Sequence, residues 1–342
     1  MNVSKKQRKQ TMPHTLTYKA AGVDIEEAEK VIHDIAGLRE QTEKKRKLFQ
    51  AFGLFSASYD LSHYTSPVIF TACDGVGTKI QLLLKYDLLE YAGIDLVAMN
   101  VNDILTSNAQ PLLFLDYIGT DHINRSTIQR VIKGIVQGLE GCDCILAGGE
   151  TAEMPGLVDP DMIELSGFCV GAAEKDDILD PLSIQDGDTI IGLPSNGLHA
   201  NGWSLIRKII EENPKSFADA EINTLLAPTR IYYPEVMALN KEQVPIKGMA
   251  HITGGGIPEN FTRILKNHGA RLKLPKWGNR SAQKVLSFIT PEEAIQTFNM
   301  GVGWMMVADA RHSDAILSTL PEAICLGEVT GTELIVEQEK NS

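Results

Sequence analysis

Five glycine-rich stretches limit the possible folds of this chain, because they recur where predicted β-strands end. They are DGVGTK (74–79), AGGETAEMPG (147–156), PSNGLHANG (194–202), HITGGGIPEN (251–260) and FNMGVG (298–303). Glycine lets backbone N–H groups approach a ligand closely and supports turns with positive φ. Such turns bind anions, and three of the five lead into a predicted helix, whose N-terminus adds partial positive charge. Together they predict a large anionic ligand, or two ligands, between lobes.

Strand-like and helix-like patterns alternate along the whole chain, which predicts an α/β or α+β fold. The predicted strands of the first half are 67–73, 111–118, 144–147 and 163–174, and its predicted helices are 78–93, 95–108 and 125–141. Gly93 is expected to end the first helix and Asp95 to cap the second. The second half predicts strands at 188–194, 246–252 and 301–309, helices at 201–213 and 257–268, and a C-terminal helix with two short strands. We expect two lobes of similar size that divide near residue 175.

Composition excludes several classes of protein. The 342 residues are 43% hydrophobic and 22% charged, as in a globular protein, and no apolar run reaches the roughly 18 residues of a membrane span. The net charge of −12 argues against nucleic-acid binding but not against anionic small substrates. The N-terminal MNVSKKQRKQ is basic without an apolar stretch, so it does not resemble a secretory signal. Five irregularly spaced cysteines favour a reducing cytoplasm.

The DGVGTK stretch matches neither a Walker A loop nor a G-x-G-x-x-G motif. Its informative residue is Asp74, because a carboxylate beside phosphate-binding amides repels phosphate unless a cation lies between them. Mg²⁺ suits this role, since it commonly bridges carboxylates to phosphate. Lys79 would then neutralise a phosphoryl oxygen. The alternative is that Asp74 only caps the turn and that Lys79 is a surface residue.

Two further acids are candidates for the same site. Asp103 belongs to a polar stripe of the helix at 95–108, with Asn100 and Ser107 on the same face and Asn102 beside it. The alternative is an ordinary solvated face. Glu150 follows two glycines and a buried strand, and Thr151 follows Glu150. With Asp74, these acids are predicted to gather at or near strand ends of one lobe, which would form a Mg²⁺–nucleotide site.

Two histidines lie near glycine-rich loops of the second half. His199 is inside SNGLHANG and is a candidate phosphate donor, proton carrier or loop brace. His251 ends a strand before TGGG, where we expect a structural role. Ser195, Asn196 and Asn201 are neutral donors suited to phosphate or sugar hydroxyls. No spacing of histidine and cysteine fits a zinc site.

Taken together, these motifs resemble the phosphoribosylformylglycinamidine cyclo-ligase family, also called aminoimidazole ribonucleotide synthetases. The segments that carry the resemblance are YKAAGVDI (18–25), DGVGTK (74–79), GIDLVAMNVNDI (93–104), PLLFLDYI (111–118), GGETAEMPG (148–156), GFCVG (167–171), SNGLHANGWSLIRKI (195–209), LLAPTRIY (225–232), HITGGG (251–256) and FNMGVG (298–303). They occur in the family's order. Related kinases and hydrogenase maturation proteins share the superfamily, but the full GGETAEMPG and HITGGG phrases are similar to the cyclo-ligases.

The resemblance implies an ATP-dependent ligase that closes the ring of formylglycinamidine ribonucleotide. The products would be aminoimidazole ribonucleotide, ADP and phosphate, in a cytoplasmic step of de novo purine synthesis. It also implies a homodimer whose N-terminal lobes share a barrel-like sheet, with no nucleic-acid or membrane partner. The alternative is a related ATP-dependent phosphotransferase. A non-catalytic nucleotide-binding relative would be expected to lack the three acids.

The resemblance also implies a division of the chain and of its site. Residues 1–17 would be a flexible basic tail, 18–174 the ATP-binding, metal-binding and dimerisation domain, and 175–342 a C-terminal α/β domain. The implied catalytic residues are Asp74, Lys79 and His199, and the implied metal ligands are Asp74, Asp103 and Glu150. The implied nucleotide-binding residues are Lys19, Asp74, Gly75, Gly77, Thr78, Lys79, Asn102, Asp103, Gly148, Gly149, Glu150 and Thr151. The implied substrate-binding residues are Ser195, Asn196, Gly197, His199, Asn201, Thr253, Gly254, Gly255 and Gly256.

Two departures from the family pattern leave questions open. Gln110 stands where many members carry an acid, which would weaken a metal site if that acid binds the metal and would change nothing if it is structural. The stretch 49–58 retains only Gly53 where members carry several glycines, which leaves the mobility of that loop open. The sequence also leaves open which loops contact ATP, which contact the substrate, and which group moves protons.

Overall fold

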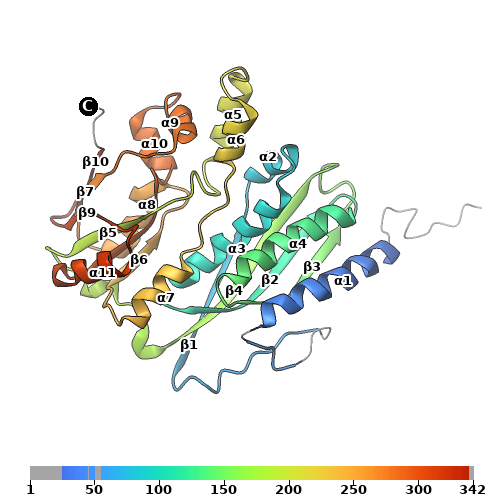
Figure 1. Cartoon of the computed structure of the whole chain (residues 1–342), viewed down its shortest axis with the longest axis horizontal. Helices are drawn as coiled ribbons and strands as arrows, with labels where there is room; N and C mark the ends of the chain where they lie inside the picture. Colours follow the sequence, from blue (N-terminus) through green and yellow to red (C-terminus); the bar gives the residue numbers. More distant parts are fainter. Residues whose placement is uncertain (1–24, 45, 51–54, 339–342) are drawn as a thin grey trace, which may run out of the picture.

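The computed structural model describes residues 25–44, 46–50 and 55–338, and it contains two β-sheets (Figure 1). The first sheet has the strand order β1-β4-β2-β3, formed by β1 (Pro67–Gly75), β4 (Ile163–Glu174), β2 (Gln110–Thr120) and β3 (Ile145–Glu153). β4 pairs antiparallel with β1 and β2, and β2 pairs parallel with β3. The expected tail at 1–17, Lys19 and Gly53 lie outside the described residues.

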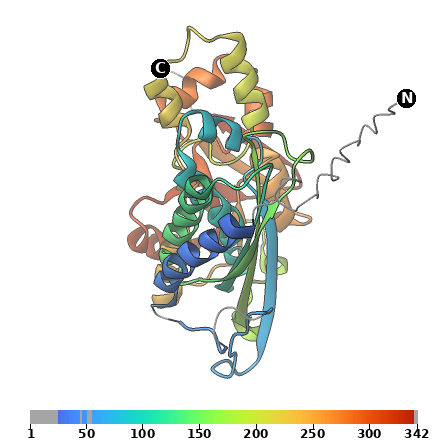
Figure 2. The ribbon, with the colours of Figure 1, turned by 90° about the vertical axis from the view of Figure 1, so that its right-hand side faces the viewer.

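Helices cover one face of this first sheet and leave the other face open (Figure 2). They are α1 (Ile25–Arg39), α3 (Leu89–Leu105) and α4 (Arg125–Glu140), and a 3₁₀ turn, η2 (Glu40–Glu43), follows α1. The helix α3 is central, because it packs on the sheet and α4 and also contacts α7 and β6 of the other lobe. This double contact explains why nearly every side of α3 is buried.

The structure corrects the predicted break between the first two helices. α2 spans Lys79–Lys85, and α3 begins at Leu89, so Gly93 and Asp95 lie inside α3 instead of ending or capping a helix. Gly93 is needed for close packing, since a Cβ there would lie 2.2 Å from the backbone oxygen of Val131 in α4. Asp95 is fully buried and forms an ion pair with Lys79.

The second sheet is mixed and has the strand order β10-β7-β9-β5-β8-β6. Its strands are β5 (Thr189–Pro194), β6 (Gly248–His251), β7 (Ala270–Leu274), β8 (Val302–Ala308), β9 (Ile324–Val329) and β10 (Leu334–Gln338). β8 and β9 each pair antiparallel with β5, β6 pairs antiparallel with β8, and β7 pairs antiparallel with β9. The C-terminal ends of β5, β6 and β7 therefore meet at one edge of the sheet.

Helices and short turns surround the second sheet. The 3₁₀ turns are η3 (Lys175–Asp177), η4 (Pro181–Ser183) and η5 (Ala310–His312). The helices are α5 (Trp203–Glu212), α6 (Asp219–Leu225), α7 (Tyr233–Lys241), α8 (Gly256–Leu265), α9 (Arg280–Leu286), α10 (Pro291–Thr297) and α11 (Ser313–Thr319). The sequence pattern missed α6, α7, α9, α10 and β7, which are short elements, and it also missed the 15-residue α1.

The predicted fold class, two lobes of α+β or α/β type, is confirmed by these two sheets and their helices. We keep the expected division at 174/175 for naming the N-terminal and C-terminal lobes. Among the described residues, no helix has the length and apolar character that a membrane crossing requires.

Candidate functional site between the lobes

Two of the predicted acids meet where the lobes contact each other, and we call the surroundings of this acid pair the cleft. Asp74 lies near the end of β1, where its backbone N–H donates to Oδ1 of Asn100 at 2.9 Å, and Nδ2 of Asn100 donates back to the Asp74 carbonyl at 3.2 Å. These two hydrogen bonds attach the end of β1 to α3. Asp103 lies one turn further along α3, beside Asp74. The half-exposed Asp103 side chain and the part-buried Asp74 therefore present two carboxylates to one place.

The environment of Asp74 disfavours its charged form. Burial raises the pKa of the Asp74 carboxyl above its usual value, and the Asp103 carboxylate acts in the same direction. The backbone N–H of Gly75, which donates to Oδ1 of Asp74 at 2.7 Å, and the nearby His251 oppose this rise. A buried carboxylate with a raised pKa beside a second carboxylate is typical of a site that gains from a bound cation.

His251 contacts this pair from the C-terminal lobe, although the sequence indicated only a structural role. Its Nδ1 lies 3.0 Å from Oδ1 of Asp103, and its Nε2 lies 3.3 Å from Nδ2 of Asn102. One signal could have identified it: His251 ends β6 two residues before Thr253 of TGGG, at the same sheet edge as the SNGLHANG loop.

We expected Asn102 to bind the nucleotide, but its side chain bonds to the C-terminal lobe. Its Nδ2 donates to the Arg230 carbonyl at 2.8 Å, and its Oδ1 accepts the backbone N–H of Tyr232 at 3.0 Å. The side chain is fully buried. Asn102 therefore joins α3 to residues 230–232 of the C-terminal lobe.

The structure buries Lys79, which was expected either to neutralise a phosphoryl oxygen or to lie at the surface. Its side chain is fully buried, with Nζ 2.7 Å from Oδ2 of Asp95 and 2.9 Å from the Ala227 carbonyl oxygen. Oδ1 of Asp95 also accepts bonds from the backbone N–H and the hydroxyl of Thr229, at 2.7 and 2.6 Å. Lys79 thus belongs to a buried link between the lobes, because its side chain reaches Ala227 of the C-terminal lobe. The sequence around Lys79 gives no sign of this distant partner.

Glu150 is the predicted acid that the structure does not bring to the pair. β3 continues through GGETAE to Glu153, so Glu150 and Thr151 lie within a strand instead of a loop at its end. Glu150 is in register with Tyr117, whereas Asp74 and Asp116 are both in register with Gly167 of β4. Because side chains alternate along strands, Glu150 points to the face opposite Asp74. Accordingly, the described residues hold no group of three metal-binding acids, histidines or cysteines.

Asp116 is a buried acid that the sequence reasoning missed. Burial raises its pKa to about 7. Its carboxylate fills the space beside Gly149, where a Cβ would lie 2.3 Å from Oδ1 of Asp116. Gly149 is therefore needed for close packing against Asp116. In the sequence, only the glycine itself indicated that another side chain packs there. Gly148, on the opposite face, has more room.

His199 braces its loop. Its Nε2 accepts the backbone N–H groups of Asn196 and Arg230, at 3.2 and 3.4 Å, and its ring packs on Gly303 and Tyr232. Burial, and then the nearby cationic groups, lower the pKa of His199 well below its usual value. The ring is therefore neutral and enclosed. Of the three roles expected from sequence, this geometry favours the loop brace.

We expect His199→Asn to lower the melting temperature by about 5 °C or more, because it removes a buried ring whose acceptor holds two backbone segments. Asparagine tolerates the left-handed φ of 59° at this position. Because the pKa of His199 is lower in the folded protein than the unfolded value of about 6.5, the unfolded chain binds a proton first as the pH falls, and the folded protein loses stability. His199→Asn removes this group, so the variant should lose less stability at low pH. Melting curves at several pH values, with kcat alongside, check this. A normal melting temperature with a large fall in kcat would contradict the brace.

Glycine-rich loops from both lobes meet beside the acid pair. The hydroxyl of Thr78, after Gly75 and Gly77, lies 3.0 Å from that of Ser204 in the first turn of α5. Gly77 has a φ of +60° with open space around it, as expected for a loop that a ligand approaches. The helix α5 follows Gly202, whose φ is +76°.

The 253–256 loop lies against the 195–201 loop. Oδ1 of Asn201 is 3.4 Å from the position that a Cβ on Gly254 would take, and Nδ2 of Asn201 is buried without a hydrogen-bond partner among the described residues. Asn260, which the sequence reasoning missed, donates to the carbonyls of Thr253, Gly254 and Gly256 and so shapes this loop. The loop passes through Gly255, with a φ of +87°, into α8. The N-termini of two ten-residue helices thus adjoin the cleft and favour anions.

Gln110 lies outside the cleft. Its Oε1 accepts the hydroxyl of Tyr233 at 3.2 Å, and its Nε2 donates to the Pro111 carbonyl at 3.1 Å. The substitution of an acid by glutamine at this position therefore acts on the junction between β2 and α7, away from Asp74 and Asp103.

Comparisons with known proteins decide the family. Family models for the N-terminal and C-terminal domains of AIR synthase related proteins match residues 61–173 and 185–338. The chain is 43% identical over 320 residues to the phosphoribosylformylglycinamidine cyclo-ligase of Thermodesulfovibrio yellowstonii, covering 90% of this chain and 93% of the relative. This chain belongs to the phosphoribosylformylglycinamidine cyclo-ligase family. The cyclo-ligase of Neisseria meningitidis is 41% identical over 324 residues, covering 91% and 93%.

Solved structures agree on the fold of this cyclo-ligase. Thiamine-monophosphate kinase from Stenotrophomonas maltophilia has a TM-score of 0.64 at 16% identity, covering 88% of this chain and 94% of that chain. The hydrogenase maturation protein HypE in complex with ATP has a TM-score of 0.66 at 15% identity, covering 91% of each. The cyclo-ligase relatives confirm the expected reaction: the protein converts formylglycinamidine ribonucleotide to aminoimidazole ribonucleotide in purine synthesis, and it belongs to an ATP-using family.

Proposed function

We propose that ring closure takes place in the cleft between the lobes, with Asp74 and Asp103 holding Mg²⁺ against the ATP phosphates. The observation that carries this is the pairing of two carboxylates, one half-exposed and one with a raised pKa, beside open glycine-rich loops. Oxygen donors of this kind fit Mg²⁺, which takes few protein ligands and completes its shell with phosphate and water. When bound, the ion would neutralise charge on the transferring phosphoryl group.

The chain's own groups would then orient the reaction. ATP phosphorylates the amide oxygen of the substrate, which turns a poor leaving group into phosphate. The amidine nitrogen attacks the activated carbon, and phosphate leaves. The N–H groups at the starts of α5 and α8 would bind anionic oxygens, and His251 would hold Asp103 in place through its Nδ1. Because His199 and Lys79 are enclosed, we assign them to the framework of the site.

Coupled product assays test this proposal. We expect purified protein with Mg-ATP and formylglycinamidine ribonucleotide to form aminoimidazole product in step with ADP and phosphate. Omitting Mg²⁺ should abolish both signals. Release of ADP without an imidazole product would point to the alternative, a phosphotransferase with another acceptor. Full activity in a chelator would overturn the proposed metal site.

We also propose that two copies of the chain associate through the open face of the N-terminal sheet. Ile69 of β1 and Phe168 of β4 are 59% and 42% exposed on this face, although both are large apolar residues. Leu113 and Leu115 of β2 lie beside them in register with β4. An uncovered apolar sheet face is a liability in a monomer, and a second copy of the same face would cover it.

The change Phe168→Lys is expected to convert the dimer to a monomer, because it places a charge in the middle of this face. Ile335→Lys is the matched control, since Ile335 is 40% exposed in β10 of the other lobe. Size-exclusion chromatography with light scattering measures the mass of each. A dimer that survives Phe168→Lys, or a wild-type monomer, would contradict the proposed interface.

A cytoplasmic location is proposed on chemical grounds. The five cysteines are free thiols, and three of them, Cys142, Cys144 and Cys169, are buried. Burial raises the pKa of the Cys142 and Cys144 thiols, which keeps them unreactive. Such unpaired thiols suit a reducing compartment.

A further inference from the structure

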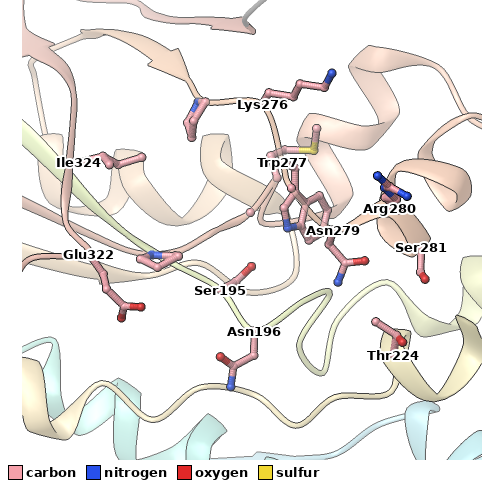
Figure 3. A pocket seen from close by; sticks show the side chains of 15 residues that line it. Ser195, Asn196, Thr224, Lys276, Trp277, Asn279, Arg280, Ser281, Glu322 and Ile324 are labelled. Carbon is pink, nitrogen blue, oxygen red and sulfur yellow. The ribbon is translucent and has the colours of Figure 1, made fainter. Parts of the chain in front are cut away.

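One cavity lies in the C-terminal lobe, and neither Asp74 nor Asp103 lines it. It has a volume of about 650 Å³, which is in the range of sites for small organic ligands. Its walls come from the ends of β5 and β7, the starts of β8 and β9, and residues 275–281 (Figure 3). We call it the 276–281 pocket. None of the expected site residues except Ser195 and Asn196 lines it.

The 276–281 pocket has an excess of positive charge. Lys276 and Arg280 line it and are exposed, and neither forms an ion pair or hydrogen bond with another described residue. The acid on its wall, Glu322, is already paired, because its Oε2 accepts Nη2 of Arg230 at 2.6 Å. In a chain with a net charge of −12, two unpaired cations at one cavity favour an anionic ligand.

Neutral polar groups accompany the two cations. Oδ1 of Asn279 accepts the backbone N–H of Ala282, which leaves its Nδ2 free to donate, near Gly197. Asn196 uses its Nδ2 weakly, at 3.4 Å from the Pro228 carbonyl, so its Oδ1 can accept. Figure 3 shows Asn279, Ser195 and Asn196 around the same space, with Ser281 and Thr224 at one side. Donors and acceptors of this kind match the hydroxyl groups of a sugar.

One loop connects this pocket to the cleft. Ser195 and Asn196 line the 276–281 pocket, while Asn201 of the same loop adjoins Gly254 beside the cleft. The pocket and the surroundings of Gly254 therefore share the 195–201 loop. His199 and Arg230 brace the loop from within.

We infer that the 276–281 pocket binds the phosphate monoester of a ribose, and that the phosphoribosyl end of the substrate is its occupant. Lys276 and Arg280 would bind the phosphate, and Asn196, Asn279 and Ser195 would bind the ribose hydroxyls. This inference rests on the established reaction, whose substrate carries a ribose 5-phosphate. A free ribose phosphate that acts as an effector has the same chemistry, and the test separates the two sources.

The test compares Lys276→Ala/Arg280→Ala with the charge-matched control Lys215→Ala/Arg311→Ala, whose exposed cations lie elsewhere in the same lobe. We expect the KM for formylglycinamidine ribonucleotide to rise about 10- to 100-fold in the pocket variant, because charge-assisted bonds to phosphate are lost. The KM for ATP and kcat should stay within about twofold, since the change spares the acid pair. The control should match wild type, and melting curves verify that both variants fold.

Ribose 5-phosphate serves as a direct probe. We expect it to bind wild type in calorimetry, to compete with the ribonucleotide substrate, and to bind the pocket variant at least about tenfold more weakly. Trp277 lines the pocket, so its fluorescence gives a second readout. Binding without competition, with an unchanged substrate KM, would overturn the substrate as occupant and indicate an effector. Equal binding by wild type and variant would overturn the pocket as a phosphate site. Because calorimetry needs no turnover, it reports on the pocket even if the ring-closure assay fails.

Discussion

Replacing Asp74 by asparagine is expected to reduce kcat for ring closure by roughly a thousandfold, which is the scale of losing a charged group at a phosphoryl-transfer site. The substitution keeps the size of the side chain and the backbone bonds between Asp74 and Asn100. It removes one of the two carboxylates that we propose to hold Mg²⁺. The loss should therefore appear in catalysis and in the Mg²⁺ dependence, and the fold should be retained.

The burial of Asp74 determines whether Asp74→Asn is expected to raise or lower the melting temperature. Because burial and Asp103 raise the pKa of Asp74, the charged form is disfavoured in the metal-free protein. A neutral asparagine relieves this cost, so the melting temperature without Mg²⁺ should be unchanged or higher.

The measurement is kcat as a function of Mg²⁺ concentration, with melting curves on the same samples. Asp186→Asn is the matched control, because Asp186 is an exposed acid that contacts His268 far from the cleft. Turnover within a fewfold of wild type in Asp74→Asn would exclude Asp74 as a metal ligand. A large drop in melting temperature would instead assign it a structural role.

Replacing Asp95 by asparagine is expected to destabilise the protein by about 3–5 kcal/mol, as found when one partner of a buried ion pair is removed. Both side chains of the Lys79–Asp95 pair are fully buried. Burial lowers the pKa of Lys79, and Asp95 opposes that effect. Without Asp95, the Lys79 ammonium would lose its counter-charge in the interior, and Thr229 would lose the carboxylate that accepts its two bonds.

A second variant separates the ion pair from simple packing. Lys79→Met/Asp95→Leu replaces both charges by apolar groups, so we expect it to be less destabilised than Asp95→Asn. Melting temperature and urea midpoints measure this, with kcat for each variant. A phosphate-binding role for Lys79 predicts the opposite pattern, in which Lys79→Met keeps its melting temperature and raises the KM for ATP. That result would restore the original expectation for Lys79.

Several features of the fold and site were predictable because they depend on short segments. The strand before DGVGTK, the helix at 125–140 and the glycines that precede α5 and α8 follow from local periodicity and backbone freedom. Asp74 was chosen because an acid beside anion-binding loops is chemically unusual, and Asp103 because it belongs to a polar stripe of a helix. The resemblance to the cyclo-ligase family also depends on contiguous motifs, and the comparisons confirm it.

Other features depend on partners distant in the chain, and only the tertiary structure decided them. Lys79 contacts Ala227, and Asn102 contacts Arg230, more than 120 residues away. The face on which Glu150 lies depends on how far β3 pairs with β2, and the segment around Glu150 does not reveal this. The local sequence pattern indicates which residues can bind a phosphate or a metal. Burial and register across the two lobes determine which of them face the cleft, because desolvation and strand alternation act on the assembled chain.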